Sequence, residues 1–254
     1  MIELFYKTKW LTDKPYRIFI LGFFFVFLGT FFSLLIFKSS ASFPTIFLTT
    51  FAAVPTMNEI LKKEKLERKV KNIFTRHFKI AEIYSYLFFG MSFAFAIIYA
   101  FMPIDLTSNL FSEQRNIISG GLFLGSTALS RIIINNIGLV VFFFILAIFY
   151  GSGSVFLLSW NASILGLTWG NGIKAVLSFL SPVVLASDIF LQSFYLLPEV
   201  LAYFFAAIAG GIVSVNILNK KNFDIAFKDA LFYLVASVFL ILIAGFIEVI
   251  ILSL

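Results

Sequence analysis

The stretch IFILGFFFVFLGTFFSLLIF, residues 18–37, carries no charged side chain. A helix needs about 20 apolar residues to cross the hydrocarbon core of a bilayer, so this stretch predicts a membrane-spanning helix. A cleaved signal peptide has a shorter apolar region of about 7–15 residues, which favours a retained span. The polar residues before it include Lys7, Lys9, Lys14 and Arg17. By the positive-inside rule these cations favour a cytoplasmic N-terminus.

The composition of the whole chain extends this prediction. Of its 254 residues 61% are hydrophobic and 13% are charged, whereas a soluble domain has roughly 25% charged residues. We therefore expect an all-α, polytopic transmembrane helical bundle in the cell membrane, with about six or seven spans in a single transmembrane domain. The expected spans cover residues 18–37, 42–57, 80–101, 132–150, 154–169, 198–218 and 230–254.

Two stretches are polar or interrupted enough to predict interfacial or re-entrant segments. Residues 104–130 are rich in Gly and Ser, and residues 175–195 contain Pro182 and Asp188. Non-helical backbone is tolerated at membrane depth only where protein or water satisfies it. We expect both segments to connect the spans on either side of them.

The most charged region, residues 58–79, is predicted to be a cytoplasmic loop, because two spans separate it from the basic N-terminus. Its basic residues are Lys62, Lys63, Lys65, Arg68, Lys69, Lys71, Arg76 and Lys79. Their aliphatic stems and charges suit a helix lying at the lipid headgroups. Docking of a cytoplasmic protein is the alternative. The net charge of the chain is +6, and its Lys and Arg residues concentrate next to predicted spans. Nucleic acid is therefore not an expected partner.

The sequence lacks the motifs of ATP hydrolysis, thiol catalysis and di-metal catalysis. The chain has no Cys and one His, His77, which lies in the basic loop. No Gly-rich loop is followed by Lys-Ser or Lys-Thr, and no pair of carboxylates has the spacing of a di-metal site. We therefore expect no enzyme activity and no cofactor.

Five polar residues in the apolar second half of the chain are candidates for an intramembrane polar cluster. They are Asn135, Asn136, Arg131, Glu199 and Glu248. A carboxylate in hydrocarbon is costly, so such groups face other helices or a cavity. We expect Glu199 to follow Pro198 in the first turn of a helix, and an Asn amide to reach Glu199 or Glu248.

Several motifs of the chain, in their order, resemble the stage II sporulation protein M family in its archaeal form. These motifs are Phe47 to Pro55, Arg131-Ile-Ile-Ile-Asn135-Asn136, the Gly151–Ser154 break, Trp160-Asn-Ala-Ser163, Leu197-Pro198-Glu199 with Gly210-Gly211, and Gly245-Phe-Ile-Glu248. The family typically has His-Gly shortly before that Glu, where this chain has Tyr195-Leu196. The resemblance implies a non-enzymatic membrane component that assembles with other proteins.

Two functions follow from these observations. The first is a scaffold that contacts membrane lipid and other membrane or cytoplasmic proteins, with a homo-oligomer left open. The second is a transporter or channel subunit, in which broken helices form a polar cavity. A sealed polar cluster would favour the scaffold, and a water-filled one the transporter.

Overall fold

The computed structural model of the chain describes residues 11, 13–38, 40–66, 73–116, 128–150, 154–177, 182–216 and 223–252. Every regular element within these ranges is a helix, which confirms the predicted all-α class. Lipid offers no hydrogen-bond partner to a peptide group. Sequences this apolar therefore satisfy their backbone within helices.

Within the described ranges, five helices are long and apolar enough to cross a bilayer. The candidate spans, chosen by length and composition, are Tyr16–Ile36 of α3, Phe78–Phe101 of α5 (Ile73–Phe101), Leu129–Phe149 of α8 (Ala128–Tyr150), Ser193–Ser214 of α10 (Pro182–Asn216) and Asp224–Ile251 of α11 (Phe223–Leu252). At about 1.5 Å per residue, each is long enough for the roughly 30 Å core. The chain is therefore a multi-pass membrane protein.

Two other expected spans form helices that lack this high hydropathy. Helix α4 (Ser42–Leu66) continues past residue 57 into the basic region. Helix α9 (Ser154–Leu177) carries polar residues along its length, and its Ser159 and Ser163 are fully buried. Ser163 accepts from Gln114 and Ser159 from Thr50 of α4, so these two buried hydroxyls of α9 face protein and not lipid.

The span expected to end at residue 169 belongs to a longer helix, because α9 runs on to Leu177. Gly170 lies inside this helix and has a packing role. A Cβ at Gly170 would lie 2.7 Å from the carbonyl oxygen of Ala96, so this glycine lets α9 approach α5 closely.

The expected helix start at Pro198 is wrong. Helix α10 begins at Pro182, and Pro198 lies inside it. The expected re-entrant or interfacial segment at 175–195 is thus mostly the first half of one long helix. Proline is tolerated within membrane helices because neighbouring groups compensate for the lost hydrogen bond.

The segment after α5 is helical but short, with α6 at Ile104–Leu110 and a further turn at 112–116. Its side chains form hydrogen bonds to other parts of the chain. Asn109 Nδ2 donates to the carbonyl of Lys38, and its Oδ1 accepts from the backbone N–H of Ala41. Gln114 is fully buried and bridges Ser42 on α4 and Ser163 on α9. Residues 117–127 lie outside the described residues.

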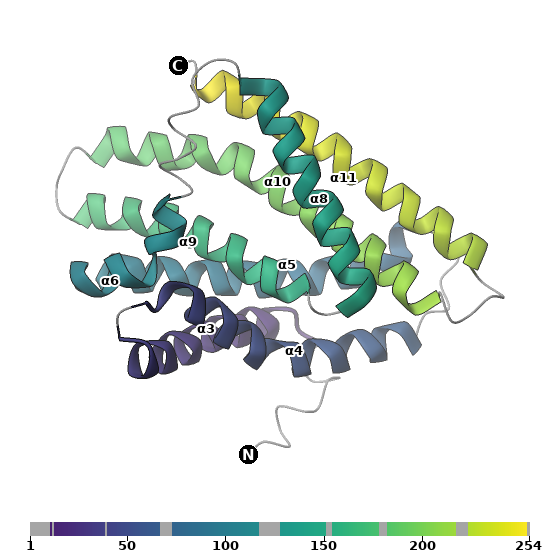
Figure 1. Cartoon of the computed structure of the whole chain (residues 1–254), viewed down its shortest axis with the longest axis horizontal. Helices are drawn as coiled ribbons and strands as arrows, with labels where there is room; N and C mark the ends of the chain where they lie inside the picture. The colour runs from purple at the N-terminus through teal and green to yellow at the C-terminus, as the bar shows by residue number, and fades with distance from the viewer. Residues whose placement is uncertain are drawn as a thin grey trace. The chain divides into compact units, whose positions relative to one another are not determined.

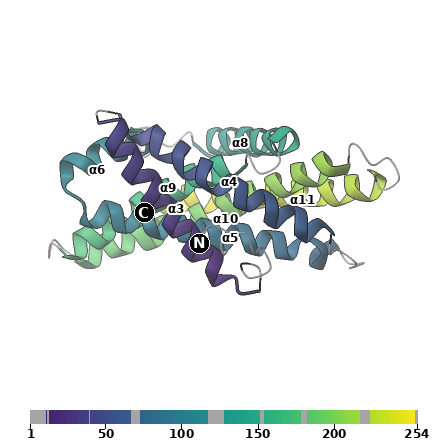
Figure 2. The same cartoon turned by 90° about the horizontal axis from the view of Figure 1, so that it is seen from below.

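The chain divides into two compact units by its contacts, and α10 contributes to both. The first unit contains α3, α4, α5, α6 and α9. Helix α3 packs on α4 and α5 (Figures 1 and 2). A Cβ at Gly22 would lie 2.6 Å from the carbonyl oxygen of Leu87, and one at Gly90 would collide with the carbonyl of Phe19. Glycines on both helices thus allow close backbone contact, the usual device of membrane bundles.

The second unit contains α8, α11 and α10 from Ser187 onward. Helix α8 packs on α11, and the two lie together in Figure 1. The hydroxyl of Ser237 on α11 donates to the carbonyl of Ala202 on α10 at 2.7 Å. Helix α10 is the most buried of the three helices: 61% of its 18-residue window is buried, against 22% for α8 and for α11. The two outer helices therefore offer most of their apolar surface to the surroundings.

Candidate functional site

The polar cluster of the second unit is centred on Asn136 of α8. Its Nδ2 donates to Glu199 Oε1 of α10 at 2.5 Å, and Tyr203 Oη donates to its Oδ1 at 3.1 Å. The exposed fractions are 7% for Asn136, 9% for Glu199 and 3% for Tyr203. The expected contact between an Asn amide and Glu199 is confirmed, and it joins two spans that lie far apart in the sequence.

Close packing of α8 and α10 brings these groups together. The rings of Phe143 and Tyr203 stack with their centroids 4.8 Å apart and their planes at 11°. About two turns further along α10, a Cβ at Gly210 would collide with the carbonyl oxygen of Phe144. The small residue and the stacked rings therefore set the separation at which the amide reaches the carboxylate.

Helix α10 presents a row of polar side chains that the sequence analysis missed in part. Tyr195, Glu199 and Tyr203 are spaced four residues apart, which places them on one helical face. This spacing was the signal that could have identified the two tyrosines. Glu248 of α11 lies within electrostatic range of both Glu199 and Tyr195, so α11 brings a second carboxyl group toward the same row.

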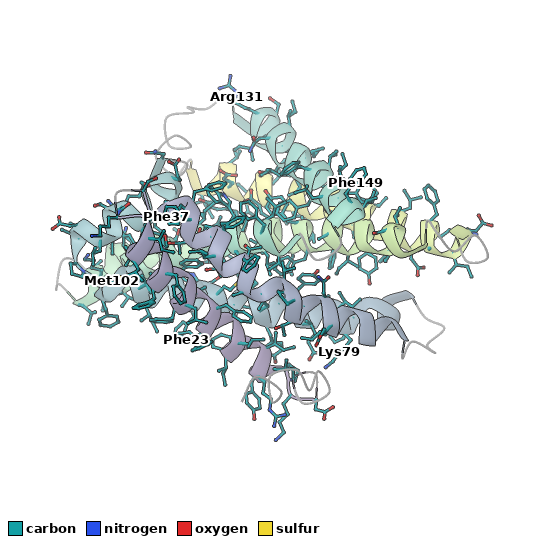
Figure 3. The ribbon with its side chains drawn as sticks, turned by 60° about the horizontal axis from the view of Figure 1, so that its bottom comes forward. Phe23, Phe37, Lys79, Met102, Arg131 and Phe149 are labelled. Carbon is teal, nitrogen blue, oxygen red and sulfur yellow. The ribbon has the colours of Figure 1, made fainter. Side chains whose placement is uncertain are left out.

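The other predicted members of the cluster lie further out. Asn135 and Arg131 are exposed, and Glu248 is half-buried. Figure 3 labels Arg131 near the end of α8 opposite Phe149. Neighbouring residues on a helix point about 100° apart. Only one of the two adjacent asparagines can therefore face α10, and Asn136 is the one that does.

The arrangement is a buried, hydrogen-bonded contact between α8 and α10. Each polar atom of the Asn136 side chain has a partner on α10, and Glu199 receives the amide inside the helix pair. Glu199 was expected in the first turn of a helix, but it lies well inside α10, and its donor is the side chain of Asn136. Among the described residues, no group of three or more His, Cys, Asp or Glu is placed to hold a metal ion.

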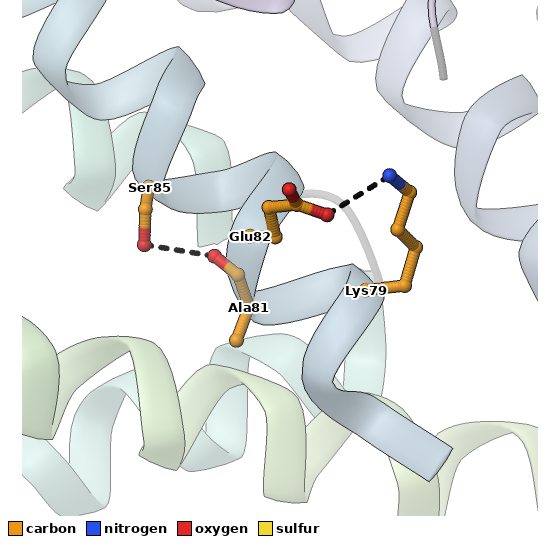
Figure 4. Close-up of polar contacts among 4 residues, drawn as sticks. All are labelled: Lys79, Ala81, Glu82 and Ser85. Carbon is orange, nitrogen blue, oxygen red and sulfur yellow. Dashed lines mark hydrogen bonds and ion pairs between the residues drawn. The ribbon is translucent and has the colours of Figure 1, made fainter. Parts of the chain in front are cut away.

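The basic region is helical where the structure describes it, at 58–66 and 73–79. Of its eight basic residues, Lys79 alone has a described side chain. Its Nζ donates to Glu82 Oε2 at 2.9 Å (Figure 4). One turn further, the Ser85 hydroxyl donates to the carbonyl of Ala81 at 2.8 Å. The other basic side chains, Lys62 to Arg76, lie outside the described residues.

Comparison with known proteins gives one finding. The family model for stage II sporulation protein M matches residues 85–251, which include α8 to α11 and the Asn136–Glu199 pair. No curated protein and no solved structure matches the chain. Since the matched region covers more than half of the sequence, the chain belongs to the stage II sporulation protein M family.

Proposed function

We propose that this chain is a non-enzymatic scaffold that assembles other proteins in the cell membrane. The observation that carries the proposal is the enclosed state of the polar cluster. Asn136, Glu199 and Tyr203 are each at most 9% exposed and bind one another. Groups arranged in this way join helices rigidly, whereas a transport site has to exchange its ligands with water. The transporter reading therefore has less support.

The outer helices of the second unit are the surfaces that would receive partners. Helices α8 and α11 are the most apolar of the five candidate spans in the described part of the chain, yet only 22% of each window is buried. Helix α11 also presents an apolar face formed by Leu234, Val235, Val238, Phe239 and Leu242. Partner spans or a second copy of this chain would pack there, with lipid covering the remaining surface.

Site-specific crosslinking in the native membrane tests the scaffold. The photoreactive amino acid p-benzoylphenylalanine is placed at Phe239 or Phe149, which are 62% and 77% exposed, and as a control at Phe143, which is 2% exposed. We expect discrete protein adducts at one or both exposed positions, and none to other proteins at Phe143. The tagged chain should also migrate on native gels as a larger species than the purified protein.

Two outcomes would contradict the scaffold. The first is crosslinking to lipid alone at both exposed positions, together with a chain from the membrane that migrates on native gels as the purified chain does. The second is a proton or ion flux in proteoliposomes that Glu199→Gln abolishes without lowering the thermal unfolding midpoint. That flux would establish the transporter reading.

The orientation of the chain follows from its charge distribution and gives a separate prediction. We propose that residues 1–17, 58–79 and 219–229 lie in the cytoplasm, because Lys and Arg concentrate there. The chain has no Cys, so single cysteines can be introduced at will. With an impermeant thiol reagent added outside intact cells, Leu66→Cys should stay unlabelled until the cells are opened. Ile104→Cys, at the opposite end of α5 and 66% exposed, should react directly. The reverse labelling pattern would refute this orientation.

A further inference from the structure

Asn135 lies deep in a candidate span and has no hydrogen-bond partner in the described part of the chain. It is the seventh residue of the span Leu129–Phe149, and it lies about 6 Å along the helix from the middle of that span. Its side chain is exposed, and no described residue bonds to its amide. An amide without a partner in hydrocarbon is costly, and the core of a bilayer holds no water to supply one. The fold of the single chain thus leaves a polar group that a further helix would satisfy.

Asn135 belongs to a continuous exposed face of α8, which we call the α8 seam. Its members are Asn135, Gly138, Phe142, Ile145 and Phe149, and each of them is exposed. They follow one another in alternating steps of three and four residues. This is the heptad spacing of two helices that cross at about +20°. The α8 seam therefore has the period that packs along a second helix over about four turns.

Gly138 gives the α8 seam room for a second backbone. A Cβ at Gly138 would have no neighbour within 4 Å, whereas one at Gly210 would collide with the carbonyl oxygen of Phe144. Gly138 therefore has no role in packing α8 within the described part of its own chain. Small residues let two membrane helices approach closely. An open glycine one turn from an unpartnered amide indicates a helix contact that the single chain does not contain.

The chemistry of the amide favours a second copy of this chain as the partner. An amide carries donors and an acceptor in one group, so two identical amides can each donate to the other. Copies inserted with the same orientation have Asn135 at the same depth, and a two-fold axis along the membrane normal brings two parallel α8 helices together. In coiled coils a buried Asn pairs with its counterpart in this way and fixes a dimer in register. An identical chain has the matching amide at this depth by necessity, whereas another protein would have it only by coincidence.

We propose that two copies of this chain dimerise along the α8 seam, with Asn135 of each copy hydrogen-bonded to the partner's Asn135. Gly138 lies where the two helices come closest. The adjacent amides then serve different contacts, since Asn136 donates to Glu199 within its own chain. This inference rests on the proposed function, because it names the partner that one outer helix of the second unit receives. Helix α11 stays open to other proteins.

Single-cysteine crosslinking in the native membrane tests the α8 seam. The chain has no Cys, so a copy with one introduced Cys cannot form a disulfide with itself. Two differently tagged copies are expressed together, and the membranes are oxidised with copper phenanthroline. Phe142→Cys and Ile145→Cys should each give a species of twice the chain mass that both tags capture, because facing seam residues come within the roughly 7 Å between Cα atoms that a disulfide spans.

Val235→Cys on α11 is the control for chance collisions. Val235 is 62% exposed, against 48% for Phe142 and 43% for Ile145, so collisions alone would favour the control. We expect both seam variants to form disulfides several-fold faster than Val235→Cys.

Substitutions at Asn135 and Gly138 test the two features that define the contact. Fluorescence transfer between differently tagged copies, measured across a dilution in detergent, gives the dissociation constant of the dimer. Asn135→Leu should raise this constant about tenfold or more, because the interhelical hydrogen bonds are lost, whereas Asn135→Gln keeps an amide and should raise it less. Gly138→Ala should also raise it, whereas Gly211→Ala, at another glycine with open space, should not. In excess detergent, where the copies separate, none of these variants should lower the unfolding midpoint.

The outcomes distinguish failure of the dimer from failure of the scaffold. Seam disulfides that form no faster than that of Val235→Cys would overturn the dimer, as would equal dissociation constants for Asn135→Leu and the unaltered chain. The scaffold would still stand if benzoylphenylalanine at Phe239 forms adducts with other proteins. Seam disulfides without any adduct to another protein would establish the dimer and remove the support for further partners. Should Asn135→Leu not elute as a single species, Gly138→Ala decides, and an unchanged dissociation constant there would overturn the proposal.

Discussion

Replacing Gly210 with Ala is expected to destabilise the second unit by about 1–3 kcal/mol, the usual cost of overpacking a closely packed interior. The added Cβ would collide with the carbonyl oxygen of Phe144 and lie 2.7 Å from the Cβ of Ala147. Neither α8 nor α10 can relieve a clash with backbone by rotating a side chain. Thermal unfolding in detergent should show a midpoint lowered by several degrees.

Gly211, the next residue, supplies a matched control. A Cβ at Gly211 would have no neighbour within 4 Å, so Gly211→Ala should leave the midpoint within the error of the measurement or raise it slightly, since Ala favours helix more than Gly does. Equal midpoints for the two variants would mean that α10 does not pack on α8 through Gly210.

Substitution of Asn136 by Leu should lower stability by about 1–3 kcal/mol. It removes the hydrogen bonds to Glu199 and from Tyr203, each worth roughly 0.6–1.7 kcal/mol inside a membrane protein. It also leaves the buried carboxyl group of Glu199 without its amide donor. The free energy of unfolding, measured by reversible denaturation in mixed micelles, checks this value.

Asn135, the neighbouring residue, provides a control that distinguishes loss of the specific hydrogen bonds from a general loss of polarity. Asn135 is exposed, so Asn135→Leu should change stability by no more than about 0.5 kcal/mol, as is usual for surface substitutions. Glu199→Gln keeps an oxygen that accepts from Asn136 and should cost less than Glu199→Leu. If Asn135→Leu proves as harmful as Asn136→Leu, the cluster does not hold α8 against α10.

Hydropathy alone predicted the helical membrane fold, because the lipid environment leaves the backbone few alternatives. The apolar runs that begin near residues 18, 80, 132 and 230 correspond to α3, α5, α8 and α11. The ends of helices were harder to predict. Pro198 and Gly170 are ordinary signals of helix boundaries in water, but both lie inside helices here. In a bilayer, continuing a helix satisfies more backbone groups than ending it does, so these signals lose their usual weight.

The polar cluster was predictable in its membership and not in its geometry. The cost of a carboxylate in hydrocarbon indicated that Glu199 faces another helix, and Asn136 was one of two adjacent amides that could meet it. The row formed by Tyr195, Glu199 and Tyr203 was visible in the sequence as a spacing of four. Spacing along one helix cannot say which face of a second helix it meets.

By itself, therefore, the sequence determined that this chain lies in a membrane as helices and which residues are too polar for lipid, since both follow from transfer free energies summed over local segments. Only the tertiary structure decided that Asn136 faces Glu199 while Asn135 points outward, and that Gln114 joins Ser42 to Ser163. These pairings depend on the rotation and separation of whole helices. The rotation and separation of the helices depend on a few glycines, where a single added methyl group would prevent the close contact of two backbones.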